Sequence, residues 1–168
     1  MSQTKKIIVG MGNSILGDDG LGCYITSRLQ QENLDYQIVT SPSSGFNLAD
    51  HIIDKDQAVF IDSIITGKHN PGDVITYCLE DFKSCQPFSI HSTDLANAIQ
   101  LYQKFNIPIP SQILFIAVEV KDNYTFKENF SPEISENIDH IYNQVKFKIF
   151  DFFSCTNRVK EYKGGING

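Results

Sequence analysis

Several patterns that would assign this 168-residue chain to a familiar class are missing from its sequence. Lysine and arginine total 14 against 20 acidic residues, and the resulting net charge of -6 disfavours nucleic acid or an anionic membrane as a partner. No apolar run reaches the roughly 18 residues that span a bilayer. The four cysteines form no C-x-x-C pair and no signal-peptide pattern precedes the first apolar strand. We therefore expect a reduced, cytoplasmic protein, and we expect it to be a monomer.

Common nucleotide-binding and nucleophile motifs are also missing. Gly10-x-Gly12 begins like a dinucleotide fingerprint, but Ile15 replaces the third glycine and Thr40, rather than an acid, ends the second predicted strand. The chain has no Walker pattern and no G-x-S-x-G elbow. Cys23 falls within a helical apolar stripe, where a buried structural thiol is the default. These absences argue against NAD binding, NTP binding and a serine or cysteine nucleophile.

The segments that are present alternate between strand and helix patterns. Short runs rich in Ile, Val and Phe predict strands at 6–10, 36–40, 58–62, 73–77 and 113–120. Their nearly continuous apolar character indicates burial on both faces. The segment 73–77 follows a Pro-Gly turn and is the candidate for an antiparallel strand. We predict a three-layer α/β/α sandwich around a mostly parallel, five-stranded twisted sheet.

Helices are predicted between these strands and after the last one. Apolar residues recur at helical spacing from Leu21 to Leu29 and from Leu95 to Tyr102, and 46–53 suits a shorter helix. The clearest helix has Ser131 as N-cap and Pro132 at its first position, with one apolar stripe that continues to Phe152. Residues 1–155 are therefore expected to form a single domain, and 156–168 a flexible tail.

Three residues at element ends form a candidate site. Tight glycines after the first strand lead to Asp19 at a helix start, Asp62 ends the third strand, and His91 comes just before a helix. Open α/β sheets bind ligands beyond the carboxyl ends of their strands, so these side chains are candidates to converge there. Two carboxylates and an imidazole suit nickel or zinc, but they equally suit acid/base work. Each residue also has a structural alternative as a cap or turn residue.

We expect structural roles for the remaining candidate residues. Asp18 is expected to cap the helix or support the site, because adjacent residues at a helix start point in different directions. His51 and His140 fall in helical segments, and His69 lies in a polar turn at the rim of the cleft. Phe126 and Phe130 are expected to anchor the polar loop that contains them.

Taken in order, these motifs resemble a known family. Gly10-x-Gly12-Asn13 followed by Asp18-Asp19-Gly20-x-Gly22 is similar to the opening signature of the [NiFe]-hydrogenase maturation endopeptidases. The similarity continues with Gly45, Asp62, Pro71-Gly72, His91 and Ser131-Pro132-Glu133, and spans the chain from about residue 6 to 153 by motif order.

The resemblance implies an activity and a role for each site residue. Members of that family remove a C-terminal extension from the hydrogenase large-subunit precursor after nickel has been installed. Their metal-contacting residues map onto Asp19, Asp62 and His91, which would be both catalytic and metal-binding, and Gly45 and Asn13 would position the substrate. Nickel would arrive with the substrate, and zinc or cadmium could occupy the same site. A metallochaperone that binds nickel through the same residues without cleavage is the alternative.

Overall fold

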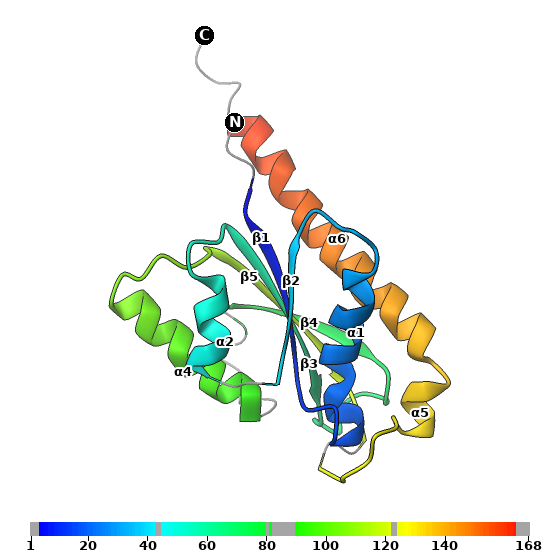
Figure 1. Ribbon diagram of the computed structural model, residues 1–168. Helices are drawn as coiled ribbons and strands as arrows, with labels where there is room; N and C mark the ends of the chain where they lie inside the picture. Colours follow the sequence, from blue (N-terminus) through cyan, green and yellow to red (C-terminus); the bar gives the residue numbers. More distant parts are fainter. Residues whose placement is uncertain (1–3, 43–44, 80, 82–89, 122–123, 164–168) are drawn as a thin grey trace.

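A five-stranded sheet forms the centre of the molecule (Figure 1). The computed structural model describes residues 4–42, 45–79, 81, 90–121 and 124–163. The strands are β1 (Lys6–Met11), β2 (Gln37–Ser41), β3 (Gln57–Ile64), β4 (Val74–Cys78) and β5 (Gln112–Glu119). They lie in the order β2-β1-β3-β5-β4, and every neighbouring pair is parallel except β4 and β5. The predicted strands, and the antiparallel direction of the fourth, are confirmed.

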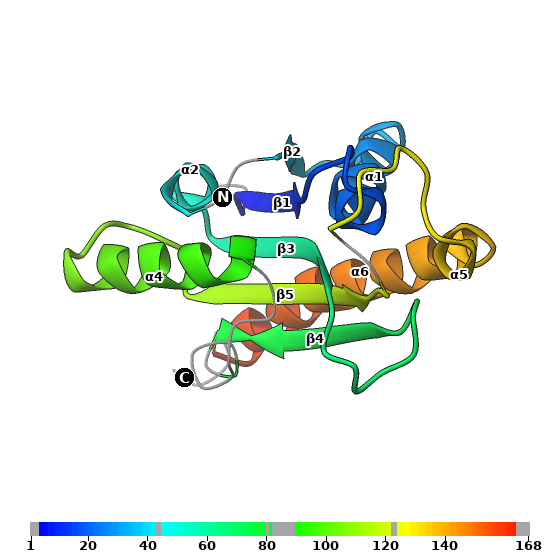
Figure 2. The ribbon, with the colours of Figure 1, turned by 90° about the horizontal axis from the view of Figure 1, so that it is seen from below.

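Helices cover both faces of this sheet, as Figure 2 shows. On one face lie α1 (Leu21–Gln30) and α6 (Ile138–Lys163), and on the other lie α2 (Phe46–Ala49) and α4 (Ile90–Lys104). The short helices η1 (Gly17–Gly20), η2 (Asp50–Ile52) and α5 (Pro132–Ser135) complete the described elements. The three-layer α/β/α prediction is therefore confirmed. None of the helices in the described part of the chain is both long and apolar enough to cross a membrane.

The central strand β3 shows why the sheet is buried on both sides. All eight of its residues are buried. Phe60 packs in the cluster under α2 and α4 and stacks on Phe115 with ring centroids 5.4 Å apart, whereas Val59 and Ile61 pack under α1 and α6. Each such side chain contributes about 1.5–3 kcal/mol of hydrophobic stabilisation. The apolar run of β3 thus holds the two helical layers together.

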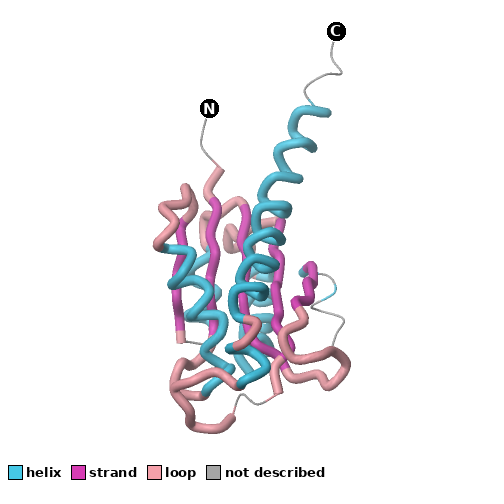
Figure 3. The backbone as a smooth tube through the Cα atoms, turned by 90° about the vertical axis from the view of Figure 1, so that its right-hand side faces the viewer, coloured by secondary structure: helices cyan, strands magenta, loops and turns pink. Residues whose placement is uncertain are grey.

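The C-terminal helix differs from the prediction. Ser131 is the N-cap residue and Pro132 the first residue of a helix, as expected, but α5 ends at Ser135 and α6 begins at Ile138. The Ser131 side chain also makes no capping hydrogen bond. α6 then continues to Lys163, beyond the end of the sheet (Figure 3), so the backbone of 156–163 is helical rather than irregular. Residues 164–168 of the expected tail lie outside the described residues.

α1 packs against the sheet with its backbone in contact. A Cβ atom on Gly22 would lie 2.4 Å from the carbonyl oxygens of both Ile61 and Met11. Because real Cβ atoms cannot approach an oxygen so closely, only glycine lets the helix sit there. The start of α1 is thereby held against β1 and β3 at their carboxyl ends.

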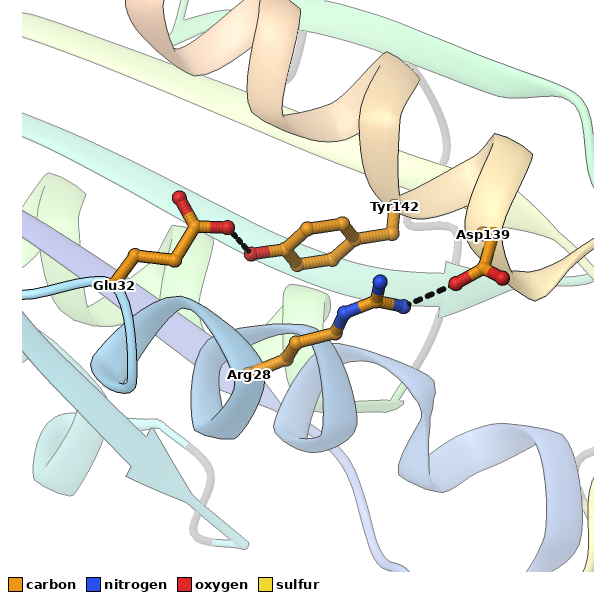
Figure 4. A network of polar contacts seen from close by, with 4 residues as sticks. All are labelled: Arg28, Glu32, Asp139 and Tyr142. Carbon is orange, nitrogen blue, oxygen red and sulfur yellow. Dashed lines mark hydrogen bonds and ion pairs between the residues drawn. The ribbon is translucent and has the colours of Figure 1, made fainter.

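A polar network joins the far end of α1 to α6 (Figure 4). The Tyr142 hydroxyl donates to Glu32 Oε1 at 2.5 Å, Lys146 pairs with the other oxygen of Glu32, and the Arg28 guanidinium lies over the Tyr142 ring. Arg28 also bonds Asp139 at 2.6 Å. The pKa of Glu32 is lowered, first by its hydrogen bond from Lys146 and then by that from Tyr142.

The lowered pKa of Glu32 predicts a pH dependence of stability. A carboxyl whose folded-state pKa lies below its unfolded value of 4.5 stabilises the fold above that value and loses the contribution as the pH falls through the folded pKa. We expect Glu32→Gln to lower the free energy of unfolding by about 1 kcal/mol at pH 7, a modest value because the pair is partly exposed. The difference should shrink in urea titrations as the pH falls from 7 to below the unfolded value of 4.5 and through the lowered folded-state pKa. A constant difference across this range would contradict the assignment.

Candidate active site

The connections of the sheet reverse between β1 and β3. From β1 the chain passes through α1 on one face to β2, and it then returns through α2 on the other face to β3, on the opposite side of β1. Ligands of open α/β sheets bind at the carboxyl ends of the strands where such a reversal occurs. Asp19 follows β1, and Asp62 lies near the carboxyl end of β3. The structure therefore places both predicted carboxylates at this crevice.

Asp19 is held by the glycine-rich turn that follows β1. It is buried in η1, and its Oδ2 accepts the Asn13 backbone N–H at 2.7 Å. Gly12 has a φ of 121°, and a Cβ there would lie 1.8 Å from the Asp19 carbonyl oxygen. Asn13 Oδ1 in turn accepts the Ile15 N–H at 3.2 Å. The turn wraps tightly around Asp19, so Asn13 orients this carboxylate through its backbone.

Asp62 approaches the same point from β3. It is buried, pairs with Ala117 of β5, and its Oδ1 accepts the Ser63 N–H at 2.9 Å. Both carboxylates lie near the Cys23 thiol, whose pKa is raised to about 11 mainly by burial and further by the charges of Asp19 and Asp62, against a hydrogen bond with the Ser41 backbone. Cys23 is buried and its thiol donates to the Gly12 carbonyl oxygen at 3.1 Å, as expected for a structural thiol.

The backbone of His91 belongs to the same edge of the sheet. His91 is the second residue of α4, and its side chain lies outside the described residues. A Cβ on Gly45 would lie 3.3 Å from Cβ of Asp94, so the first turn of α4 packs against the segment that follows β2. Gly45 itself precedes α2 with φ 59° and ψ −127°, a conformation that suits glycine. Gly45 and the start of α4 therefore flank the crevice.

Asp18 contacts a different part of the chain from its neighbour Asp19. It is buried, and its Oδ1 accepts the Ser131 backbone N–H at 2.7 Å, whereas no side chain caps η1 or α1. The prediction of Asp18 as a cap for its own helix is therefore wrong, and the prediction of a supporting role is closer. Asp18 ties the glycine-rich turn to the start of α5.

Glu119 is a buried acid that the sequence analysis missed. At the end of β5, its Oε1 accepts the backbone N–H groups of Thr66 and Gly67 at 2.7 and 2.8 Å, and its Oε2 accepts the Thr66 hydroxyl at 2.7 Å. Three donors on one carboxylate fix the loop that leaves β3 beyond Asp62. An acid at the end of an apolar strand is the signal that identified Asp62, and it applies equally to Glu119.

The buried charges at this edge are of one sign. Among the described residues, the buried charged side chains are Asp18, Asp19, Asp62 and Glu119, and no lysine, arginine or histidine is among them. Burying carboxylates together is costly unless hydrogen bonds or a cation compensate. All four carboxylates accept at least one backbone N–H. Asp19 and Asp62 are the two that lie at the reversal point of the sheet, so they are the pair suited to a cation. The described residues contain no complete group of three candidate ligands, and they leave out the His91 side chain.

A pocket of about 760 Å³ opens beside the acids, between α1 and the segment before α5. Its lining includes Gly20 and Cys23, next to Asp19, and it continues to Glu128, Asn129 and Phe130. The pocket therefore lies next to the turn that carries Asp19. Of the other histidines, His51 lies in η2 and His140 in α6, helical segments as predicted, and His69 lies in an exposed turn.

Comparison with known proteins identifies the class to which this fold and this acidic cleft belong. The hydrogenase 2 maturation protease of Escherichia coli K12 is 22% identical over 146 residues, covering 84% of this chain and 88% of that protein. The structure of the E. coli hydrogenase maturating endopeptidase HybD superposes with a TM-score of 0.73 at 19% identity, covering 88% and 93% of the two chains. The [NiFe] hydrogenase maturation protease HybD from Thermococcus kodakarensis gives 0.69 at 21% identity, covering 85% and 97%. The protein therefore has the fold of the hydrogenase maturation endopeptidases.

The family profile HycI, described as hydrogenase maturation protease, matches residues 23–146. The chain accordingly belongs to the hydrogenase maturation protease family, and it is a peptidase. The resemblance seen in its motifs is confirmed.

Substitutions of two acids at this edge of the sheet should have different effects on the free energy of unfolding. We expect Glu119→Ala to lower the free energy of unfolding by about 3 kcal/mol, because it leaves the Thr66 and Gly67 amides without their acceptor. Asp62→Asn keeps an oxygen for Ser63 and removes one of several buried like charges, so stability should stay the same or rise. Urea unfolding measures both, with the exposed Glu136→Ala as control. A large loss in Asp62→Asn alone would contradict these roles.

Proposed function

We propose that this peptidase removes a C-terminal extension from the large-subunit precursor of a [NiFe] hydrogenase after nickel has been inserted. The observation that carries the proposal is the convergence of Asp19 and Asp62 at the reversal point of the sheet, within a group of buried carboxylates that includes no buried base among the described residues. Such a pair attracts a cation. Nickel, as cargo of the substrate, supplies that cation only when the precursor is loaded.

The donor set fits nickel. Two carboxylate oxygens, with the imidazole of His91 from the start of α4, give mixed oxygen and nitrogen ligands that suit a borderline divalent ion and leave positions for ligands from the substrate. Zinc or cadmium would satisfy the same donors. The hydrogen bond from the Asn13 amide holds one oxygen of Asp19 in place before the substrate arrives.

Cleavage then follows from the position of the substrate peptide relative to the two aspartates. The scissile peptide lies in the crevice beside Asp19 and Asp62, a water attacks its carbonyl carbon, the C–N bond breaks, and the departing amine takes a proton. The water is activated either by a carboxylate acting as base or by the metal, and well-placed acid/base groups contribute about 10²- to 10⁴-fold. Gly45 at the entrance to α2 lets the substrate backbone pass close to the enzyme.

Nickel acts as the signal for cleavage because the enzyme binds the extension of a nickel-loaded precursor differently from that of a precursor without nickel. A precursor without nickel lacks the bonds to the two aspartates and His91 that hold its extension in register, so it stays uncut. A metallochaperone using the same residues would bind metal and leave the precursor intact. Membership of a protease family favours cleavage. The dinucleotide alternative finds no support, since the Thr40 hydroxyl at the end of β2 is bonded to Thr26 at 3.0 Å.

The proposal predicts separate effects of substitutions on folding and on processing. Asp19→Asn, Asp62→Asn and His91→Ala should fold but process nickel-loaded precursor at least 10²-fold more slowly, because each removes a ligand or a base. Mass spectrometry of the large subunit measures the shortened product. Asp151→Asn, the same change at an exposed position on α6, is the control and should be as active as the unmodified enzyme.

Two further outcomes discriminate between the alternatives. Precursor prepared without nickel should remain full length with the unmodified enzyme. Wild-type processing by soluble, folded variants at all three positions would overturn the site assignment. Bound nickel with an intact precursor, detected by equilibrium dialysis and mass spectrometry, would favour the metallochaperone.

A further inference from the structure

The loop before α5 is bonded directly to the turn that carries the aspartates. The Lys127 N–H donates to the Ile15 carbonyl at 3.1 Å, and the Gly17 N–H donates to the Lys127 carbonyl at 2.7 Å. These bonds form a parallel bridge between Leu16 and Lys127. Asp18 adds a third bond through Ser131. In Figure 1 this loop passes beside the start of α1, so residues 124–131 and 15–19 form one connected rim of the active site.

Exposed apolar side chains gather on this rim. Phe130 anchors the loop as predicted, with its ring packed edge-on against Tyr24 at a centroid distance of 5.3 Å. The same prediction for Phe126 is wrong, because 78% of this residue is exposed. Tyr124 is 70% and Ile15 51% exposed. Ile15 and Phe126 each precede the bridge by one residue, which places them side by side.

We propose that Ile15, Tyr124 and Phe126, here named the rim patch, form a docking surface for the body of the large-subunit precursor, outside the peptide that is cut. The inference rests on the proposed function. Large apolar side chains exposed together on a monomer mark an interaction site, and aromatic side chains supply most of the binding energy at such sites. The hydrogen bonds to the 15–19 turn hold the patch in place before binding, which reduces the entropy cost of association.

The position of the patch identifies the occupant as the substrate. Ile15 lies on the same turn as Asp19, and one pocket is lined both by Ser14 and Glu128 from the rim and by Gly20, the residue after Asp19. A protein whose C-terminal segment enters that cleft has to bring its adjacent surface against the rim. A second copy of this chain could also cover the patch, and the experiment separates the two.

The test compares Phe126→Ser with Phe147→Ser. Phe147 lies on α6 and is 71% exposed, so the same substitution changes the same residue type at a similar exposure. With nickel-loaded precursor as substrate, Phe126→Ser should raise KM about tenfold with kcat unchanged, the signature of lost binding that does not depend on the reaction step. Phe147→Ser should stay within twofold. Ile15→Ser should reproduce the rise in KM, and thermal unfolding should show all three variants folded.

Every outcome bears on the docking proposal. An unchanged KM in both Phe126→Ser and Ile15→Ser, with active wild-type enzyme, would overturn it and leave the proposed function standing. If wild-type enzyme cuts nothing, direct binding of the precursor to Asp62→Asn, with and without Phe126→Ser, still decides the question: equal binding overturns docking, and weaker binding supports it. Sedimentation that shows a wild-type dimer and a Phe126→Ser monomer would assign the patch to self-association instead.

Discussion

The contact between α1 and the two central strands determines where everything else in the active site lies. Gly22 has no side chain, and the carbonyl oxygens of Met11 and Ile61 occupy the space that a Cβ atom would need. Gly10, on β1, makes the same kind of close contact from the side of the sheet. A Cβ atom on Gly10 would lie 2.3 Å from the Gly22 carbonyl oxygen. If a side chain at position 22 moved α1 away from the sheet by even the width of a methyl group, Asp19 would move with the helix. The position of the first carboxylate relative to Asp62 is therefore set by backbone packing.

The same packing accounts for the unusual accumulation of buried acids. Asp18 and Glu119 each bind backbone amides and fix two loops at the edge of the sheet, the start of α5 and the exit from β3. These hydrogen bonds fix the two loops that border the cleft, and the two carboxylates add negative charge to it. Asp19 and Asp62 lie within this field, which disfavours a further anion and favours a divalent cation. In the proposed function, the first pair would fix the loops around the cleft and add to the attraction of Asp19 and Asp62 for nickel.

The features that the sequence predicts correctly are those with a local signal. Apolar runs such as Val59 to Ile61 require burial on both faces, which allows only the inside of a parallel sheet. The location of Asp19 and Asp62 near the carboxyl ends of β1 and β3 follows from the order of the strands and helices, whereas their roles stay a prediction. The break between α5 and α6 is invisible because Ile134, Ile138 and Ile141 keep helical spacing through it. Glu119 carries the same strand-end signal as Asp62, but its bonds to the loop that leaves β3 join residues more than fifty positions apart. The exposure of Phe126 likewise depends on how its loop folds and has no local signal.

The two proposed contacts with the precursor would do different work. Docking at the rim patch involves the body of the substrate and is the same whether or not nickel is present, so it adds affinity without selectivity. Binding of nickel by Asp19, Asp62 and His91 occurs only with the loaded precursor, and it alone places the peptide for attack. An enzyme that relied on docking alone would cut immature subunits, and one that relied on nickel alone would bind its substrate weakly. Under both proposals, separating affinity from selectivity would allow the peptidase to bind many precursors and to cleave only those that have received their metal.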